Sequence, residues 1–431
     1  MINRRSTSKT IVLQLGAWIV SSGFLGLGEI SAQAAGFEKS VLWSAHWSAV
    51  GGAAASSVSG PEALFYNPAG LASTESLQFS VNGTGTWTKA TGPAEGNNTS
   101  VDSKQRLFVP VAALVSYSLN PRWGVGAGFY TAGGTRTEFN ALNITGFPLK
   151  PTPKSDLSLN EISVGTGYEI MDGLKVGAAY RILMANMDLQ YGGLSGTNLV
   201  QFNLNGLTGT RYNGFRLGVQ YAPKNEGYGF GIEWRNTVDF TLKTSSSSAH
   251  VGALNGAAVA TFTGGEASVS NKMPQNISVG GFYDLMPGRW RVLAEYTFTE
   301  YSLNKIVDVT GIAGAVRYSS IEQNWKNMSN VRLGTEYKGF EDWALRAGYV
   351  WTSQVTPKSD ASTLFSAPGS GNTVIIGAGK PIMQGLTLDG AFEYSWANGN
   401  VTAADNPATN TKLGDYNTKA YAAYLSLNYS M

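Results

Sequence analysis

Few side chains in this chain could take part in catalysis. There are only two histidines, His46 and His250, and no cysteine. A nucleophilic serine needs a general base beside it, and both histidines fall outside the predicted strands that could hold such a pair. Without cysteine there is no thiolate nucleophile and no Cys-ligated metal. We therefore predict that the protein is not an enzyme and uses no cofactor or metal.

One glycine-rich run resembles a nucleotide-binding loop, namely Gly124-Val125-Gly126-Ala127-Gly128. It lies within a predicted strand, however, and not at the strand-to-helix turn where backbone amides bind phosphate. Lys and Arg are scattered, and the formal net charge is only +2. The sequence therefore predicts neither a dinucleotide site nor a surface for nucleic acid.

The composition points to a membrane protein that crosses with strands. Only 14% of the 431 residues are charged, against about 25% in soluble domains. Beyond the N-terminal segment, no stretch approaches the roughly 20 apolar residues of a membrane-spanning helix. Apolar residues diluted by alternation are typical of a transmembrane β-barrel.

The first 34 residues have the pattern of a secretory signal. Arg4, Arg5 and Lys9 form a basic start, an apolar segment follows at 11–27, and Ala32-Gln33-Ala34 fits the small-x-small cleavage rule. The alternative is an uncleaved anchor helix. We expect a mature protein that begins at Ala35, with a plug at 35–75 and a barrel at 76–431.

The predicted plug is rich in small residues. Trp43 and Trp47 have the i,i+4 spacing of a helix. Ser59 and Glu62 fit a capping box, with serine as the N-cap. The helix that they begin should end near Asn67, because the residue before a proline is pushed out of the α region. So short a segment cannot bury a core of its own, so we expect it to pack inside the barrel.

From Ser76 onward the hydrophobic pattern has a period of two. In 386–396, Phe392 and Tyr394 share one phase while Asp389 and Glu393 share the other. In a barrel embedded in lipid, the apolar phase faces outward and the charges face the interior. We predict fourteen antiparallel strands, a number that could differ by two, near residues 76–88, 106–119, 122–140, 156–170, 173–191, 211–222, 227–243, 266–285, 288–304, 321–338, 341–354, 372–382, 385–397 and 418–430.

Short and long connections alternate between these runs. Six short turns and seven long loops, including 192–210 and 244–265, suit an even-stranded barrel with both ends in the periplasm. The last strand keeps Tyr421, Leu425 and Tyr429 in one outward phase. We expect the barrel assembly machinery to bind this apolar C-terminal strand, although it ends in Met431 and not in the usual phenylalanine.

Several segments resemble the FadL/TodX family of outer-membrane transporters of hydrocarbons and fatty acids. Ala35-Gly36-Phe37 is similar to the mature start of the family, and Asn67-Pro68-Ala69 is similar to its hatch motif. Similarity continues through 108–110, 123–139 and 273–274. The Asn-Pro-Ala triplet is a weak signal alone, but it is specific between a signal peptide and fourteen amphipathic strands.

The resemblance implies a mechanism. An extracellular groove would capture an apolar ligand, which passes to a tighter internal site near the mature N-terminus and leaves sideways through a kinked third strand. It implies roles in the kink for Gly133 and Gly134, in the hatch for Asn67, Pro68 and Ala69, and in ligand binding for Phe37, Phe129 and Lys305. We further expect Asn67 to hydrogen-bond the third strand. Each of these roles has an alternative. Gly133 and Gly134 could be ordinary barrel glycines, and the Asn67-Pro68-Ala69 turn could be a plain helix stop. Phe37 could lie in a disordered terminus, and Lys305 could be a solvated loop lysine.

The leading hypothesis is therefore passive uptake of long-chain fatty acids or related hydrocarbons across the outer membrane of a Gram-negative bacterium. A lateral exit suits such ligands, because each buried CH₂ is worth about 0.8 kcal/mol. The alternatives are a general diffusion porin, and an adhesin or phage receptor that uses the long loops. We expect a monomer surrounded by outer-membrane lipid and lipopolysaccharide.

Overall fold

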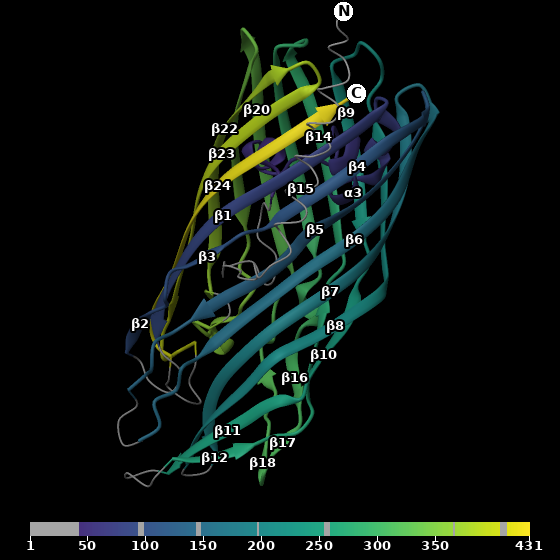
Figure 1. Cartoon of the computed structure of the whole chain (residues 1–431). Helices are drawn as coiled ribbons and strands as arrows, with labels where there is room; N and C mark the ends of the chain where they lie inside the picture. The colour runs from purple at the N-terminus through teal and green to yellow at the C-terminus, as the bar shows by residue number, and fades with distance from the viewer. Residues whose placement is uncertain are drawn as a thin grey trace, which may run out of the picture.

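The computed structural model describes residues 43–93, 99–143, 148–195, 198–253, 259–364, 367–405 and 412–431. The described strands form a closed antiparallel barrel, shown in Figure 1, in which β1 pairs with β24. The fourteen strands of the wall are, in order, β1 (Leu77–Pro93), β4 (Val111–Asn120), β5 (Trp123–Glu138), β6 (Lys154–Met171), β7 (Leu174–Ser195), β8 (Asn198–Tyr221), β9 with β10 (Tyr228–Arg235, Val238–Thr244), β13 with β14 (Ala267–Met273, Asn276–Met286), β15 (Trp290–Thr299), β20 (Met328–Phe340), β21 (Trp343–Thr352), β22 (Ser370–Met383), β23 (Leu386–Val401) and β24 (Gly414–Ser430). The prediction of a fourteen-stranded barrel is confirmed.

The burial pattern confirms the predicted orientation of the wall residues. On β23, Asp389 and Glu393 are buried in the interior, whereas Phe392 is 49% exposed on the outside. On β15, Glu295 and Thr297 face inward and Tyr296 faces outward. An outer surface of aromatic and aliphatic side chains belongs in lipid, since in water it would be an aggregation site.

Two segments predicted as loops are strands. Residues 192–210 lengthen β7 and β8, which pair up to Ser195 and Asn198. Residues 244–265 contain β11 (Ser246–Ala253), which pairs with β8, and β12 (Ala260–Thr263). These segments are rich in Gly, Asn, Ser and Thr, which dilute the apolar alternation that a prediction needs. The barrel therefore extends well beyond the height of a bilayer at its long-loop end.

Shorter elements occupy the remaining long loops. They are β2 (Ser100–Asp102), β3 (Arg106–Phe108), β16 (Ile306–Thr310), β17 (Ile312–Ala313), β18 (Val316–Arg317), β19 (Ile321–Glu322) and the 3₁₀ turns η3 (Tyr301–Leu303) and η4 (Lys358–Asp360). In Figure 1 most of them lie near the lower end of the barrel, away from the C-terminus. Because long loops are extracellular in such barrels, the opposite end, with the short turns, faces the periplasm.

The plug is a chain of short helical turns inside the barrel, which we call the hatch (residues 43–74). It consists of α2 (Ala45–Ala49), η1 (Gly60–Glu62), α3 (Ala63–Tyr66) and η2 (Pro68–Ser73). Figure 1 shows it in purple, surrounded by strands near the periplasmic end. Helix α3 ends at Tyr66, before Asn67, as predicted. None of the helices in the described residues is long and apolar enough to cross a membrane.

The predicted capping box at Ser59 is wrong. Ser59 does occupy the N-cap of η1, but its side chain makes no capping hydrogen bond. Glu62 instead accepts a hydrogen bond from Ser80 of the barrel wall at 3.1 Å. The barrel wall therefore binds the Glu62 carboxylate, which a capping box would have used within the hatch.

Candidate functional site

The backbone of the hatch lies directly against glycines of the barrel wall. Among the described residues, eight wall glycines have no room for a side chain, because an added Cβ would lie 1.8–2.6 Å from a hatch atom. They belong to eight different wall strands: Gly124, Gly167, Gly177, Gly218, Gly231, Gly334, Gly348 and Gly377. We call this set the glycine girdle. It brings the two backbones together more closely than any side chain would permit.

Asn67 is fully buried at the centre of this contact. Its Oδ1 accepts a hydrogen bond from the amide of Ala69 at 3.1 Å. Its Nδ2 donates to the carbonyls of Ala55 at 2.7 Å, Val219 at 3.1 Å and Ile232 at 3.2 Å. The expectation that Asn67 binds the third strand is therefore wrong. Its partners are the hatch itself and strands β8 and β9.

Side chains of the wall satisfy further backbone groups of the hatch. Glu295 accepts a hydrogen bond from the amide of Ala55 at 2.8 Å, and Arg332 donates to the carbonyl of Gly51 at 3.0 Å. Gln220 donates to the carbonyls of Ala55 and Val58, each at 3.1 Å. Buried backbone groups need such partners, so these contacts fix the irregular chain of the hatch across the lumen.

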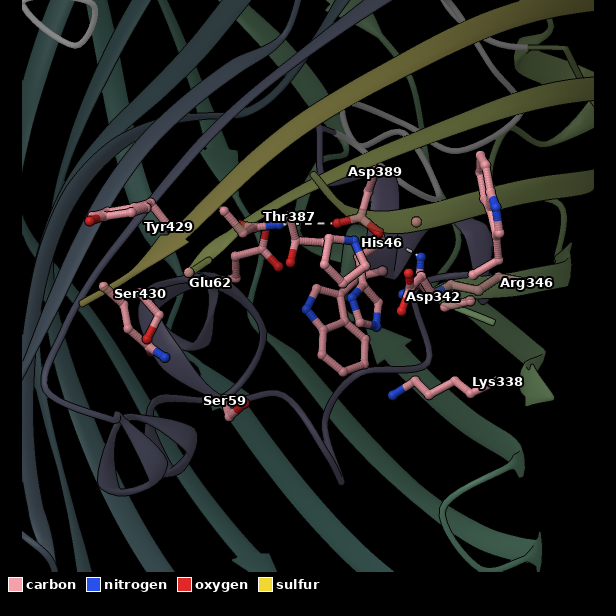
Figure 2. A pocket seen from close by; sticks show the side chains of 18 of the residues that line it. His46, Ser59, Glu62, Lys338, Asp342, Arg346, Thr387, Asp389, Tyr429 and Ser430 are labelled. Carbon is pink, nitrogen blue, oxygen red and sulfur yellow. Dashed lines mark hydrogen bonds and ion pairs between the residues drawn. The ribbon is translucent and has the colours of Figure 1, made fainter. Parts of the chain in front are cut away.

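A cavity of about 530 Å³ lies between the hatch and strands β20 to β24 and β1, at the periplasmic end. Figure 2 shows His46 and Glu62 of the hatch directed toward the same space as Lys338, Arg346 and Asp389 of the wall. Arg346 forms ion pairs with Glu336 at 2.6 Å and with Asp389 at 2.7 Å. This charged cavity is a poor site for a hydrocarbon.

Burial shifts the pKa of two hatch residues at this cavity. It lowers the pKa of His46 to about 4, and the nearby Arg346 acts in the same direction. It raises the pKa of Glu62 to about 7, and Asp389 also raises it. His46 is therefore neutral at pH 7, and Glu62 changes charge within the physiological range.

A belt of buried charges crosses the interior on the extracellular side of the hatch. Arg181 forms an ion pair with Glu161, and Arg216 with Glu233 at 3.0 Å. Arg216 also donates to the carbonyl of Leu64 in the hatch at 3.3 Å. A ligand moving toward the hatch along this part of the wall would meet buried charges, which are an unfavourable environment for an apolar chain.

Beyond this belt the interior becomes apolar. The inward side chains of β6 to β10 that lie nearer the long loops are almost all aliphatic or aromatic, and they belong to one buried cluster. We call these residues the apolar interior: Leu157, Leu159, Leu183, Met187, Leu189, Leu207, Phe240 and Leu242. This is the part of the described barrel in which hydrocarbon chains would be most stable.

An aromatic cluster connects the hatch to the third wall strand, β5. The rings of Trp43 and Phe65 pack with that of Tyr130, and the ring of Tyr66 packs with those of Trp43 and Phe65, with centroids 4.9–6.0 Å apart. The indole N–H of Trp43 donates to the carbonyl of Thr131 at 3.1 Å. The hatch therefore touches β5 through Trp43 and its neighbours, and not through Asn67.

Strand β5 departs from the barrel wall directly after this contact. Its pairing with β4 stops at Tyr130, and a register shift against β6 leaves Ala132 as a bulge. Gly134 follows with φ of 146°, a conformation that favours glycine. From 130 to 137 every residue is buried, whereas residues 123–129 include exposed and half-buried positions. These observations place a bend in the wall at the predicted glycine pair.

The β4-facing edge of β5 is unpaired over residues 132–135 in the described chain. At its periplasmic end, Val111 donates to the Thr131 hydroxyl at 3.4 Å. At its extracellular end, Glu138 accepts from the Lys104 amide at 2.8 Å and from Arg106 at 2.7 Å. We call this stretch the unpaired edge. It is an interruption in the hydrogen-bonded wall, closed at both ends.

The structure brings together some of the predicted site residues and separates others. Gly133 and Gly134 lie at the bend, whereas Pro68 and Ala69 lie in the hatch away from it. Phe37 lies outside the described residues, as do the signal segment and the cleavage site. Phe129 pairs with Ala113 and Ile162 on the outward face of the wall, so its predicted ligand contact would lie on the lipid side. Lys305 is exposed in an extracellular loop, between η3 and β16.

The histidines and acidic residues form no metal centre in the described part of the chain, where no group of three or more such side chains is arranged to hold an ion. His250 lies in the β11–β12 hairpin, and its ring contacts the hydroxyl of Thr261 at 2.9 Å. Neither the contact of Trp43 with β5 nor the glycine girdle was predicted from the sequence. Glycines recurring in the inward phase of several strands were the available signal.

Comparison with known families decides the identity of this barrel. A family model described as outer membrane protein transport protein (OMPP1/FadL/TodX) matches residues 27–431. The chain belongs to the FadL/TodX family. An outer membrane protein of Neisseria meningitidis serogroup B, NMB0088, is 23% identical over 391 residues, covering 79% of this chain and 82% of that protein.

Solved structures of FadL/TodX proteins share the fold. A FadL homologue from Pseudomonas aeruginosa superposes with a TM-score of 0.73 at 16% identity, covering 92% of this chain and 99% of that one. The toluene transporter TodX of P. putida gives 0.71 at 17% identity, with 91% and 99% covered. The monoaromatic hydrocarbon channel CymD gives 0.67 at 15% identity, again with 91% and 99% covered. As a family member, this chain is an outer-membrane transport protein of a Gram-negative bacterium.

Proposed function

We propose that this protein takes up small hydrophobic molecules, long-chain fatty acids or related hydrocarbons, by passive diffusion with a lateral exit at β5. The observation that carries the proposal is the unpaired edge of β5 at 132–135, which lies beside the apolar interior while the hatch occupies the axial route. The ligands named for TodX and CymD, toluene and monoaromatic hydrocarbons, belong to the same chemical class.

The axial route is unfavourable for such a ligand for two reasons. The hatch packs against the wall without clearance at the glycine girdle, and the cavity that remains beside it is charged. The buried ion pairs of Arg181 and Arg216 line the wall between the hatch and the apolar interior. A ligand that leaves through the wall enters lipid directly and never exposes its chain to water, at about 0.8 kcal/mol per CH₂. Phe37 remains a proposed ligand contact at the internal site, and Lys305 remains one on the extracellular side.

Uptake of radiolabelled oleate and toluene by a deletion strain, with and without the restored gene, tests the proposal. We expect uptake of at least one ligand to depend on the gene, and Gly134→Val to reduce it by about tenfold, because valine strains the backbone at this φ. Gly83→Val is the matched control, since Gly83 lies in β1 with nothing within 4 Å of an added Cβ. Uptake that is the same without the gene for both ligands would exclude this function.

A second measurement separates the proposal from a general diffusion porin. A plugged barrel should conduct little current in planar lipid bilayers, whereas a porin should conduct in steps of constant size. Large, stable conductance steps from the pure protein would favour the porin.

A further inference from the structure

Four hydroxyl groups lie around the inner side of the unpaired edge. Thr86 and Thr88 are on β1, Thr137 is on β5 and Ser155 is on β6. Strand β3 lies between the two groups, since it pairs with β1 at Thr86 and Thr88 and flanks β5 (Figure 1). We call these four residues the hydroxyl collar.

The register shows that the two halves of the collar are at the same height. Ser103 accepts a hydrogen bond from the amide of Ala90 on one side and forms a bridge with Phe139 on the other. Thr88 precedes Ala90 by two residues, and Thr137 precedes Phe139 by two residues, on strands that run in the same direction. Two interstrand spacings separate their backbones, about 10 Å. Ser155 is the register partner of Thr137.

All four collar residues are buried, with at most 7% of each exposed. Their side-chain oxygens have no hydrogen-bond partner among the described residues. Other buried hydroxyls of the wall are mixed: Ser278 pairs with Thr297 at 3.0 Å, whereas Ser116 and Thr299 are single hydroxyls without a partner among the described residues. A buried hydroxyl without a partner costs about 1–3 kcal/mol, so four in one place require a common explanation.

The surroundings indicate what kind of group could bind there. The apolar side chains of Phe108, Phe139 and Leu142 are buried around the collar. The nearest charges are already ion-paired, Arg106 with Glu138 at 2.7 Å and Arg136 with Asp156 at 2.8 Å. Hydroxyls both donate and accept hydrogen bonds, so the collar suits a neutral polar group at the end of an apolar chain.

We propose that the hydroxyl collar binds the polar head of the transported molecule, one half of the collar at a time, while its chain lies in the apolar interior. The ligand class would then be neutral oxygenated hydrocarbons, such as long-chain alcohols, in preference to plain alkanes. This inference rests on the proposed lateral uptake and specifies its substrate. Binding at the wall would orient the molecule with its head at the exit.

The test compares 1-hexadecanol with hexadecane, which differ only in the hydroxyl group. Uptake of each labelled compound is measured in the deletion strain expressing wild-type protein, Thr86→Val/Thr88→Val, or Thr137→Val/Ser155→Ala. Valine has the shape of threonine without the hydroxyl. We expect each double variant to take up the alcohol about tenfold more slowly and the alkane at the wild-type rate.

Control variants keep the result interpretable. Thr86→Ser/Thr88→Ser retains the hydroxyls and should retain alcohol uptake, and Ser278→Ala/Thr297→Val removes hydroxyls far from the unpaired edge and should change neither rate. Folding of every variant is checked by heat-dependent gel mobility. Equal losses for both compounds, or no loss for either, would overturn the inference. Wild-type protein that carries neither compound, nor oleate or toluene, would instead refute the proposed function.

Discussion

The amide oxygen of Asn67 occupies the space that a side chain on Gly218 would need, since a Cβ added at Gly218 would lie 1.8 Å from Asn67 Oδ1. Asn67 belongs to the hatch and Gly218 to β8, so this contact joins the two parts of the molecule. The carbonyl of the neighbouring Val219 accepts a hydrogen bond from the same amide group. The position of Asn67 therefore depends on the absence of a side chain at Gly218 as well as on its hydrogen bonds.

Replacing Gly218 with alanine should displace the hatch. The methyl group would force Asn67 out of its site, and overpacking of this kind typically costs about 1–3 kcal/mol. We expect a lower temperature for the heat-dependent shift in gel mobility and higher conductance in planar bilayers. Gly83→Ala, on the outside of β1, should have neither effect. If Gly218→Ala behaves like the wild type, the hatch can shift to accommodate the methyl group at little cost in free energy.

Removing the amide of Asn67 should weaken the same junction by another route. In Asn67→Ala, the carbonyls of Ala55, Val219 and Ile232 lose a donor inside the barrel, at about 1–3 kcal/mol for each group left unsatisfied. Proteolysis of the detergent-solubilised protein should then cut the hatch while the wall stays intact. A hatch that resists protease as well as the wild type does would mean that these bonds contribute little.

Docking of the hatch should weaken as the pH rises through about 7. Burial raises the pKa of Glu62 from its usual 4.5 to about 7. The proton is therefore bound more tightly in the docked hatch, and its contribution is fully present below pH 4.5 and lost as the pH rises through 7. Around Glu62, Asp389 raises the pKa, while hydrogen bonds from Ser44, Ser80 and Trp47 lower it.

Hydrogen exchange of residues 60–73, expressed as protection factors at pH 5.5 and pH 8.5, measures this dependence. We expect protection to fall at the higher pH in the wild type and to be equal at both in Glu62→Gln, which cannot ionise. A wild-type protein with identical protection at the two pH values would contradict the assignment.

Trp43 should hold the start of the bend in β5. Trp43→Phe keeps a ring against Phe65 and Tyr130 but loses the N–H that donates to the Thr131 carbonyl. One such hydrogen bond contributes about 1 kcal/mol, so amide exchange at 130–137 should accelerate several-fold while β23 is unchanged. Unaltered exchange at the bend would show that aromatic packing alone holds it.

The period-two alternation was sufficient to predict the barrel, its strand number and the orientation of residues such as Asp389 and Phe392. The Asn67-Pro68-Ala69 turn was also predictable, because the constraint of proline on its neighbour is local. The partners of Asn67 were not, since which strands lie beside a hatch turn depends on the whole barrel.

The glycine girdle has a consequence for how this molecule is made. With close contacts on eight strands and no room at these glycines, the hatch cannot be threaded into a finished cylinder. The seam between β1 and β24 joins residues more than three hundred positions apart in sequence, and such distant pairings close late in folding. The hatch must therefore be in place before β1 pairs with β24, and this last pairing encloses it.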